Sequence, residues 1–192
     1  MKKKIRQLCL FVLILIPMVT AAIQITRLTA LWEDVRTSEP LAIEFDVPGI
    51  VSPHLFAGDR NRMTDDAVII GVVQSGEARA YLLSAFFFRG TPSVHIVNDV
   101  FGAIPITVTH CDQKECTRVF TSDQVPGEPL DVRAGGMTLH HQLALLIDGR
   151  RYSQGSEKIP LQEVDFVQTT WKEWRQEHPQ SKIYLGDVPP AG

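Results

Sequence analysis

The sequence predicts an α+β fold: a β-rich single domain with a short C-terminal helix that contains tryptophan, preceded by an N-terminal membrane or signal helix. Three observations support this prediction. Beyond residue 40, runs rich in β-branched residues alternate with turn residues, as is typical of strands. Near the C-terminus, two tryptophans three residues apart share one helical face. The first 26 residues combine a basic start with a long uncharged segment.

Composition narrows the class of protein. The 192 residues suggest one domain, and a hydrophobic fraction of 44% is enough to bury a core, so the chain is not expected to be disordered. The formal net charge of -3 is spread over both signs. A nucleic-acid surface normally has a basic face, so no nucleic-acid partner is expected.

The N-terminus has the pattern of an export signal. A basic run, residues 1–7, precedes the uncharged segment 8–26, and small residues end at Ala22. Two outcomes remain open: cleavage after Ala22, or retention as a membrane anchor through residues 8–25. In both cases the rest of the chain should be extracytoplasmic, on the periplasmic or cell-envelope side. We expect residues 27–40 to form a stalk and residues 41–188 to form the folded domain.

The first half of that domain should begin with a hairpin. Ala67–Val73 and Ala78–Leu83 read as strands joined by the turn Gln74–Glu77. Three consecutive phenylalanines, Phe86–Phe88, do not fit a half-exposed strand, so we expect them to be buried on both sides or to contact a protein partner. A short strand should follow at His95–Val97, with turn chemistry at residues 98–102.

The next strand, residues 104–110, carries the chain's most distinctive side chains to its end. Alternation places His110 on the apolar face and Cys111 on the opposite face. Residues 117–121 should return as the partner strand, which makes Cys111–Cys116 a hairpin loop. Export to an oxidising compartment favours a Cys111–Cys116 disulfide. Zinc or copper binding, through Cys111, Cys116, His110 and His95, is the alternative.

The last part of the domain should contain another hairpin and the helix. Residues 138–147 alternate well and predict one strand with His141 on its buried side, followed by an Asp148–Gly149 turn into residues 150–153. Thr170 and Glu173 have capping-box spacing, and Pro179 should end the helix at His178. Because this helix is too short to be stable alone, Trp171 and Trp174 should bury against the sheet.

Five stretches together resemble a bacterial family known as domain of unknown function 3179. They are Gly76–Tyr81, Ile96–Asp99, Gly102–Cys111, Thr169–Pro179 and Ile183–Gly186, and they occur in the family's order over about residues 65–186. The ending Trp-x-x-Trp-x-x-x-His-Pro is the most specific of them. The resemblance implies no known activity.

Two departures from the family pattern concern the candidate site. Typical members have a His-Glu pair before Ile-Val-Asn-Asp, where this chain has Val94-His95. They also have Cys-Pro-x-Cys after the strand. Here Asp112 replaces the proline, and Cys116 comes two residues late. The resemblance therefore implies that any metal or redox centre of the family is modified in this chain.

Four further residues are candidate binding residues. Arg79 and Tyr81 share one strand face, as an anion site would require, and Asn98 and Asp99 could position a substrate or cation. An exposed strand face and turn capping explain them equally well. No complete catalytic constellation is visible. The sequence therefore favours a non-enzymatic binding or assembly module, with loop 111–116 and Phe86–Phe88 as contact surfaces. A metal- or thiol-dependent enzyme or metal-binding protein that uses Cys111, Cys116 and His110 is the alternative.

Overall fold

The computed structural model describes residue 24 and residues 40–58, 63–87 and 93–186 of the chain. These residues form a β-rich domain with one short C-terminal α-helix, as the sequence predicts. The predicted N-terminal segment lies outside the described residues, apart from residue 24. Within the described part of the chain, none of the helices has the length and apolar character needed to span a membrane.

The described strands form two sheets. The eight-stranded sheet has the order β10-β9-β8-β1-β5-β6-β7-β11, and the five-stranded sheet has the order β12-β3-β4-β13-β2. The strands of the larger sheet are β1 (Leu41–Val51), β5 (Ser93–Phe101), β6 (Ile104–Cys111), β7 (Cys116–Thr121), β8 (Arg133–Thr138), β9 (Leu143–Ile147), β10 (Arg150–Ser153) and β11 (Gln162–Glu163). The smaller sheet contains β2 (Leu55–Ala57), β3 (Val68–Gln74), β4 (Glu77–Leu82), β12 (Val167–Thr170) and β13 (Lys182–Tyr184).

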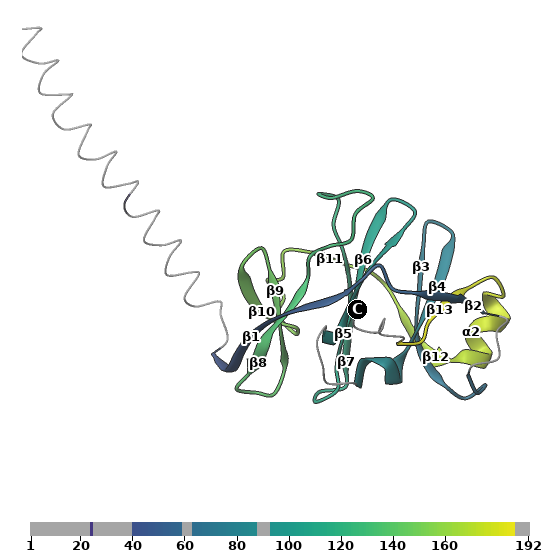
Figure 1. Ribbon diagram of the computed structural model, residues 1–192, viewed down its shortest axis with the longest axis horizontal. Coiled ribbons are helices and arrows are strands. Elements are labelled where there is room, and N and C mark those ends of the chain that lie inside the picture. Colours follow the sequence, from purple (N-terminus) through teal and green to yellow (C-terminus); the bar gives the residue numbers. More distant parts are fainter. Residues whose placement is uncertain (1–23, 25–39, 59–62, 88–92, 187–192) are drawn as a thin grey trace, which may run out of the picture. The chain divides into compact units, whose positions relative to one another are not determined.

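The two sheets share an apolar core. Tyr81 and Tyr184 from the smaller sheet pack in one cluster with Val97 and Val108 from the larger sheet. A second cluster joins β5 and β7 to β8 and β9, through Ile96, Phe120 and Leu145 among others. Figure 1 shows β1 running from the β8–β9–β10 side toward β5. This long strand pairs antiparallel with β8 and parallel with β5, so it connects the two halves of the larger sheet.

Two predicted hairpin turns are confirmed. Ser75 and Gly76, between β3 and β4, have φ angles of 50° and 80°. Asp148 and Gly149, between β9 and β10, have φ angles of 49° and 75°. Positive φ at both central residues is the signature of the type I′ turn, whose twist matches that of the flanking strands.

The predicted C-terminal helix is also confirmed as α2 (Trp171–Glu177), which Figure 1 shows beside β12 and β2. Thr170 and Glu173 form the capping box, and His178 is the C-cap. Trp171 and Trp174 are buried. A Cβ atom on Gly71 would lie 2.3 Å from the Trp174 ring, so β3 needs glycine there to let the helix dock.

Three local predictions are corrected by the structure. Residues 98 and 99 lie inside β5, which is longer than predicted, and the turn follows at Gly102. Residues 138–147 do not form one strand: β8 ends at Thr138, the chain turns where His141 adopts a φ of 59°, and β9 begins at Leu143. His141 is therefore exposed and is not a core residue.

The phenylalanine run is only partly buried. Phe86 and Phe87 belong to a 3₁₀ helix, η1 (Leu83–Phe87), in which Phe86 is fully buried and Phe87 is 46% exposed. A helical turn directs neighbouring side chains in different directions, so one ring enters the core while the next faces solvent. Phe88 lies outside the described residues.

Candidate ligand-binding site

Four side chains form a polar network between the two sheets: Glu77, Arg79 and Tyr81 of β4 and Asp99 of β5. The Arg79 guanidinium donates to Asp99 Oδ1 at 2.5 Å and to Glu77 Oε1 at 2.7 and 2.9 Å. The Tyr81 hydroxyl donates to Asp99 Oδ2 at 2.6 Å, and the backbone N–H of Val100 donates to Asp99 Oδ1. Both oxygens of the buried Asp99 carboxylate therefore have partners.

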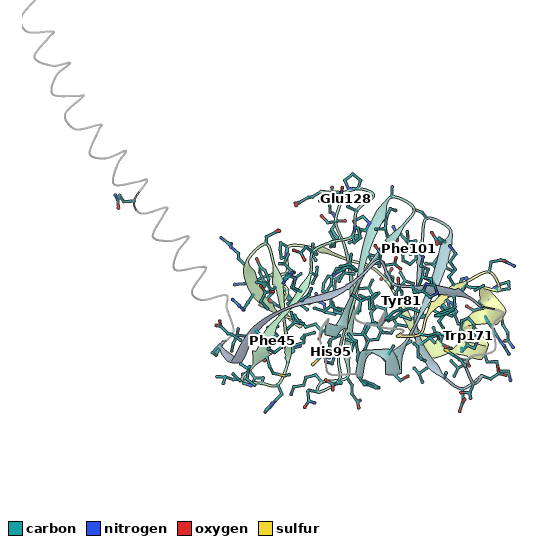
Figure 2. The ribbon with its side chains drawn as sticks, viewed as in Figure 1. Phe45, Tyr81, His95, Phe101, Glu128 and Trp171 are labelled. Carbon is teal, nitrogen blue, oxygen red and sulfur yellow. The ribbon has the colours of Figure 1, made fainter. Side chains whose placement is uncertain are left out.

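Burial and charge shift the pKa values of two members of this network. The pKa of Tyr81 is raised well above its usual value, first by burial and then by the charge of Asp99. Burial alone would lower the pKa of Arg79, but the hydrogen bond and charge of Asp99, with Glu77, raise it. Arg79 also lies 4.3 Å above the Phe101 ring, and Figure 2 labels Tyr81 and Phe101 at the centre of the domain. The network thus holds a permanent cation between two carboxylates.

The four predicted binding residues divide into two groups. Arg79, Tyr81 and Asp99 do come together, and the anion that meets Arg79 and Tyr81 is a carboxylate of the chain itself. Asn98 has different partners: its amide donates to Val132 O at 2.9 Å, and its oxygen accepts from Thr107 at 2.7 Å. Adjacent strand residues point to opposite faces, which explains the division.

Cys111 and Cys116 are directly opposed at the end of the β6–β7 hairpin. Such residues have Cα atoms about 4.5–5.5 Å apart, within the range of about 4.4–6.8 Å that a disulfide spans. The structure holds both as free thiols, so the disulfide stays a prediction. Burial, with Cys111 close by, raises the pKa of the Cys116 thiol. Cys111 is itself buried, with its thiol 3.9 Å from the carbonyl oxygen of His141.

A cavity of about 560 Å³ lies beside Cys111, and we call it the Cys111 cavity. Its walls are mainly apolar and come from β1, β8 and β9: Ala42, Ile43, Phe45, Val47, Met137 and Leu143. Its polar lining comes from β5, from the β6–β7 hairpin and from the turn after β8: His95, Cys111, Asp112, Gln113 and His141. Phe45 and His95, both labelled in Figure 2, are contributed by β1 and β5.

The predicted metal ligands come from β5 (His95) and from both faces of β6 (His110 and Cys111). His95 and Cys111 line the cavity, whereas His110, on the face of β6 opposite Cys111, contacts the rings of Phe86 and Phe87. Nδ1 of His110 lies 2.9 Å from the Thr117 hydroxyl, and its Nε2 has no hydrogen-bond partner among the described residues. Burial, followed by the charge of His95, lowers the pKa of His110. In the described ranges, no three His, Cys, Asp or Glu side chains are placed to hold a metal ion.

Sequence reasoning missed several residues of this region. Met137 and Phe45 reach the cavity only because β1 pairs with β8, and nothing local to either residue indicates that pairing. Gln154 is fully buried, and its amide donates to Thr109 Oγ1 at 2.9 Å and to Cys116 O at 3.1 Å. Gln154 is not part of the β6–β7 hairpin, but these two hydrogen bonds connect it to both strands of that hairpin. The alternation of Ile43, Phe45 and Val47 was the available signal for one apolar face of β1.

Comparison with known proteins supports the family resemblance. The family model described as "Protein of unknown function (DUF3179)" matches residues 46–187, which include the polar network, the cysteine hairpin and α2. The match begins inside β1, so Ala42, Ile43 and Phe45 of the cavity wall precede it. Neither the curated proteins nor the solved structures contain a significant match to the chain. The chain belongs to the DUF3179 family of proteins of unknown function.

Proposed function

We propose that this protein is an extracytoplasmic, non-enzymatic binding module whose Cys111 cavity takes a small, mainly apolar ligand. The cavity is the observation that carries the proposal. Small-molecule sites in proteins are typically concave, have volumes of about 300–1,000 Å³, and combine apolar walls with a few polar groups. At about 560 Å³, the Cys111 cavity has this size and this composition.

The polar lining supports selectivity. His95, Cys111 and Asp112 supply an imidazole, a thiol and a carboxylate on one side of an otherwise apolar wall. A few such groups orient a ligand, while the apolar walls supply most of the favourable free energy of binding.

Ligand protection of Cys111 tests this function on the full chain, after a reductant has opened any Cys111–Cys116 disulfide and has been removed. Cys111 is 2% exposed and lines the cavity, whereas Cys116 does not line it. The probes are 2-naphthol and indole, flat apolar molecules with one polar group. We expect each probe to slow the alkylation of Cys111 by N-ethylmaleimide several-fold and to leave Cys116 unchanged, as measured by mass spectrometry. Equal rates at Cys111 with and without both probes would overturn the proposal.

Two valine-to-phenylalanine variants test whether the probes bind in the Cys111 cavity. Val47→Phe places a larger side chain in the cavity wall and should abolish the protection of Cys111. Val73→Phe, the same change at an exposed position of β3, should leave the protection intact. Thermal unfolding establishes that both variants are folded. If Val47→Phe is folded and its Cys111 is still protected, the probes bind elsewhere and the proposal is wrong.

The second candidate function is thiol- or metal-dependent. The observation that favours it is the pair of free cysteines, directly opposed, with Cys111 in the cavity wall. Counting free thiols and measuring zinc, copper and iron on one purified sample separates the candidates. Near-stoichiometric metal that is lost in Cys111→Ser would replace the binding module with this second function. A disulfide without metal would support the binding module.

A further inference from the structure

We propose that the ligand of the Cys111 cavity is the acyl chain of a membrane phospholipid, an inference that rests on the binding function proposed above. It follows from three features: the apolar walls of the cavity, the exposed apolar side chains at its edge, and the place where the chain enters the domain. The first feature would suit many apolar ligands. The other two favour a lipid over other apolar ligands.

The edge of the cavity carries large apolar side chains that face solvent. Ile43 lines the cavity and is 61% exposed, and Leu139, between the lining residues Met137 and His141, is 56% exposed. Pairing holds them in one region, because Ile43 is the partner of Met137 and the Leu139 N–H donates to Pro40 O at 3.1 Å. Contiguous apolar side chains exposed beside an apolar cavity are typical of surfaces that contact a membrane, an apolar ligand or another protein.

The chain enters the domain at this same edge. The cavity wall begins at Ala42, the second residue of β1, and Ile43 follows it. The predicted stalk, residues 27–40, ends one residue before β1. Fully extended, these 14 residues would reach at most about 50 Å, at about 3.6 Å per residue. When residues 8–25 are retained as an anchor, the cavity stays within that distance of a bilayer, and membrane lipid is then the apolar ligand at the highest local concentration.

The shape of the acyl chain also suits the lining. A saturated chain offers no hydrogen bonds, and most of the cavity wall is apolar and requires none. The free energy of binding grows with the number of methylenes buried, so a chain that is only partly inserted binds reversibly. Lipid uptake of this kind needs no covalent step and no metal.

Photocrosslinking in vesicles tests the inference. The full chain is reconstituted in phosphatidylethanolamine–phosphatidylglycerol vesicles that contain a phospholipid with a diazirine on its acyl tail. After illumination, we expect crosslinks on Phe45, Met137 or Leu143, in addition to those on residues 8–25. Val47→Phe and Ala42→Trp should each reduce the cavity crosslinks several-fold, and Val73→Phe should not. Ala42 is exposed, so its variant narrows the cavity without changing the core.

Two outcomes overturn the inference. Crosslinks confined to residues 8–25, or to Ile43 and Leu139 alone, would mean that no acyl chain enters the cavity. Protection of Cys111 by 2-naphthol, measured in the same vesicles, separates this failure from failure of the proposed function. If 2-naphthol still protects Cys111, the cavity binds apolar molecules other than lipid. If it gives no protection and no cavity crosslinks form, both proposals fail.

Discussion

The polar network between the sheets and the Cys111 cavity both contain charged or reactive side chains, but they differ in how those side chains are satisfied. In the network, both oxygens of Asp99 accept hydrogen bonds, and Arg79 is shared between two carboxylates. In the cavity, the Cys111 thiol has one long contact with a backbone carbonyl among the described residues, and open space adjoins it.

This difference bears on which of the two regions has room for a ligand. A buried charge needs partners, and the network supplies them from two strands of different sheets, so its hydrogen bonds link those sheets. A site for a ligand needs unfilled volume, and the Cys111 cavity has it. Arg79, Tyr81 and Asp99, which are among the binding residues predicted from the sequence, do not line this cavity.

Removing the buried acid gives the largest expected effect. Asp99→Ala leaves Arg79 and Tyr81 without their shared partner, and breaking a buried pair in this way costs about 3–5 kcal/mol. Asp46→Ala is the matched control, because Asp46 also meets an arginine, Arg133, at 2.5 Å, but at the surface. It should cost about 0–1 kcal/mol. Denaturant unfolding measures both. Equal losses in the two variants would show that the network does not hold the sheets.

A buried apolar contact with a similar expected loss of unfolding free energy is the reference for the polar network. Trp174→Ala should cost about 3–5 kcal/mol, because the ring is buried on β3. Gly71→Ala should destabilise through the same contact, since its new Cβ would displace the ring. Val73→Ala, at an exposed position of the same strand, is the control. If Gly71→Ala melts like the wild type, the docking of α2 on β3 is wrong.

His110 makes a smaller contribution that depends on pH. Its pKa is lowered in the folded state by burial and by His95, with Asp112 and Glu115 opposing the shift. The unfolded chain therefore takes up a proton first, near the ordinary pKa of about 6.5. The stability is present above that pH and is lost as pH falls through the folded-state pKa.

Unfolding free energies at about pH 7.5 and 5 check this prediction. His110→Gln should lose less stability than the wild type between the two conditions. His140→Gln, at an exposed turn position, should behave as the wild type does. A His110→Gln variant with an unchanged pH dependence would place the titrating group elsewhere.

The smallest expected effect concerns the second cysteine. Because burial and then Cys111 raise the pKa of the Cys116 thiol, its iodoacetamide alkylation should be slow at neutral pH and should accelerate as pH rises. Cys111→Ser removes the neighbouring contribution and should increase the rate at about pH 8. Cys116 in the urea-unfolded chain is the reference. If folded and unfolded rates agree, the hairpin does not shield this thiol.

Features confined to a few neighbouring residues could be predicted from the sequence. The turns at Ser75–Gly76 and Asp148–Gly149, the Thr170–Glu173 capping box and the opposite directions of His110 and Cys111 are examples. Backbone conformation, capping hydrogen bonds and strand alternation act over a few residues, so local sequence is enough to specify them.

Contacts between distant segments were decided only by the tertiary structure. The partner of Arg79 and Tyr81 is Asp99, about twenty residues away, because β4 and β5 belong to sheets that pack together. The break after Thr138 is equally invisible in the local pattern, since two short apolar strands alternate as one long strand does. The cavity brings together residues as far apart in the sequence as Ala42 and Leu143, and their proximity depends on which strands pair. Strand pairing is selected by the burial of the whole core, a property that no single stretch of sequence carries.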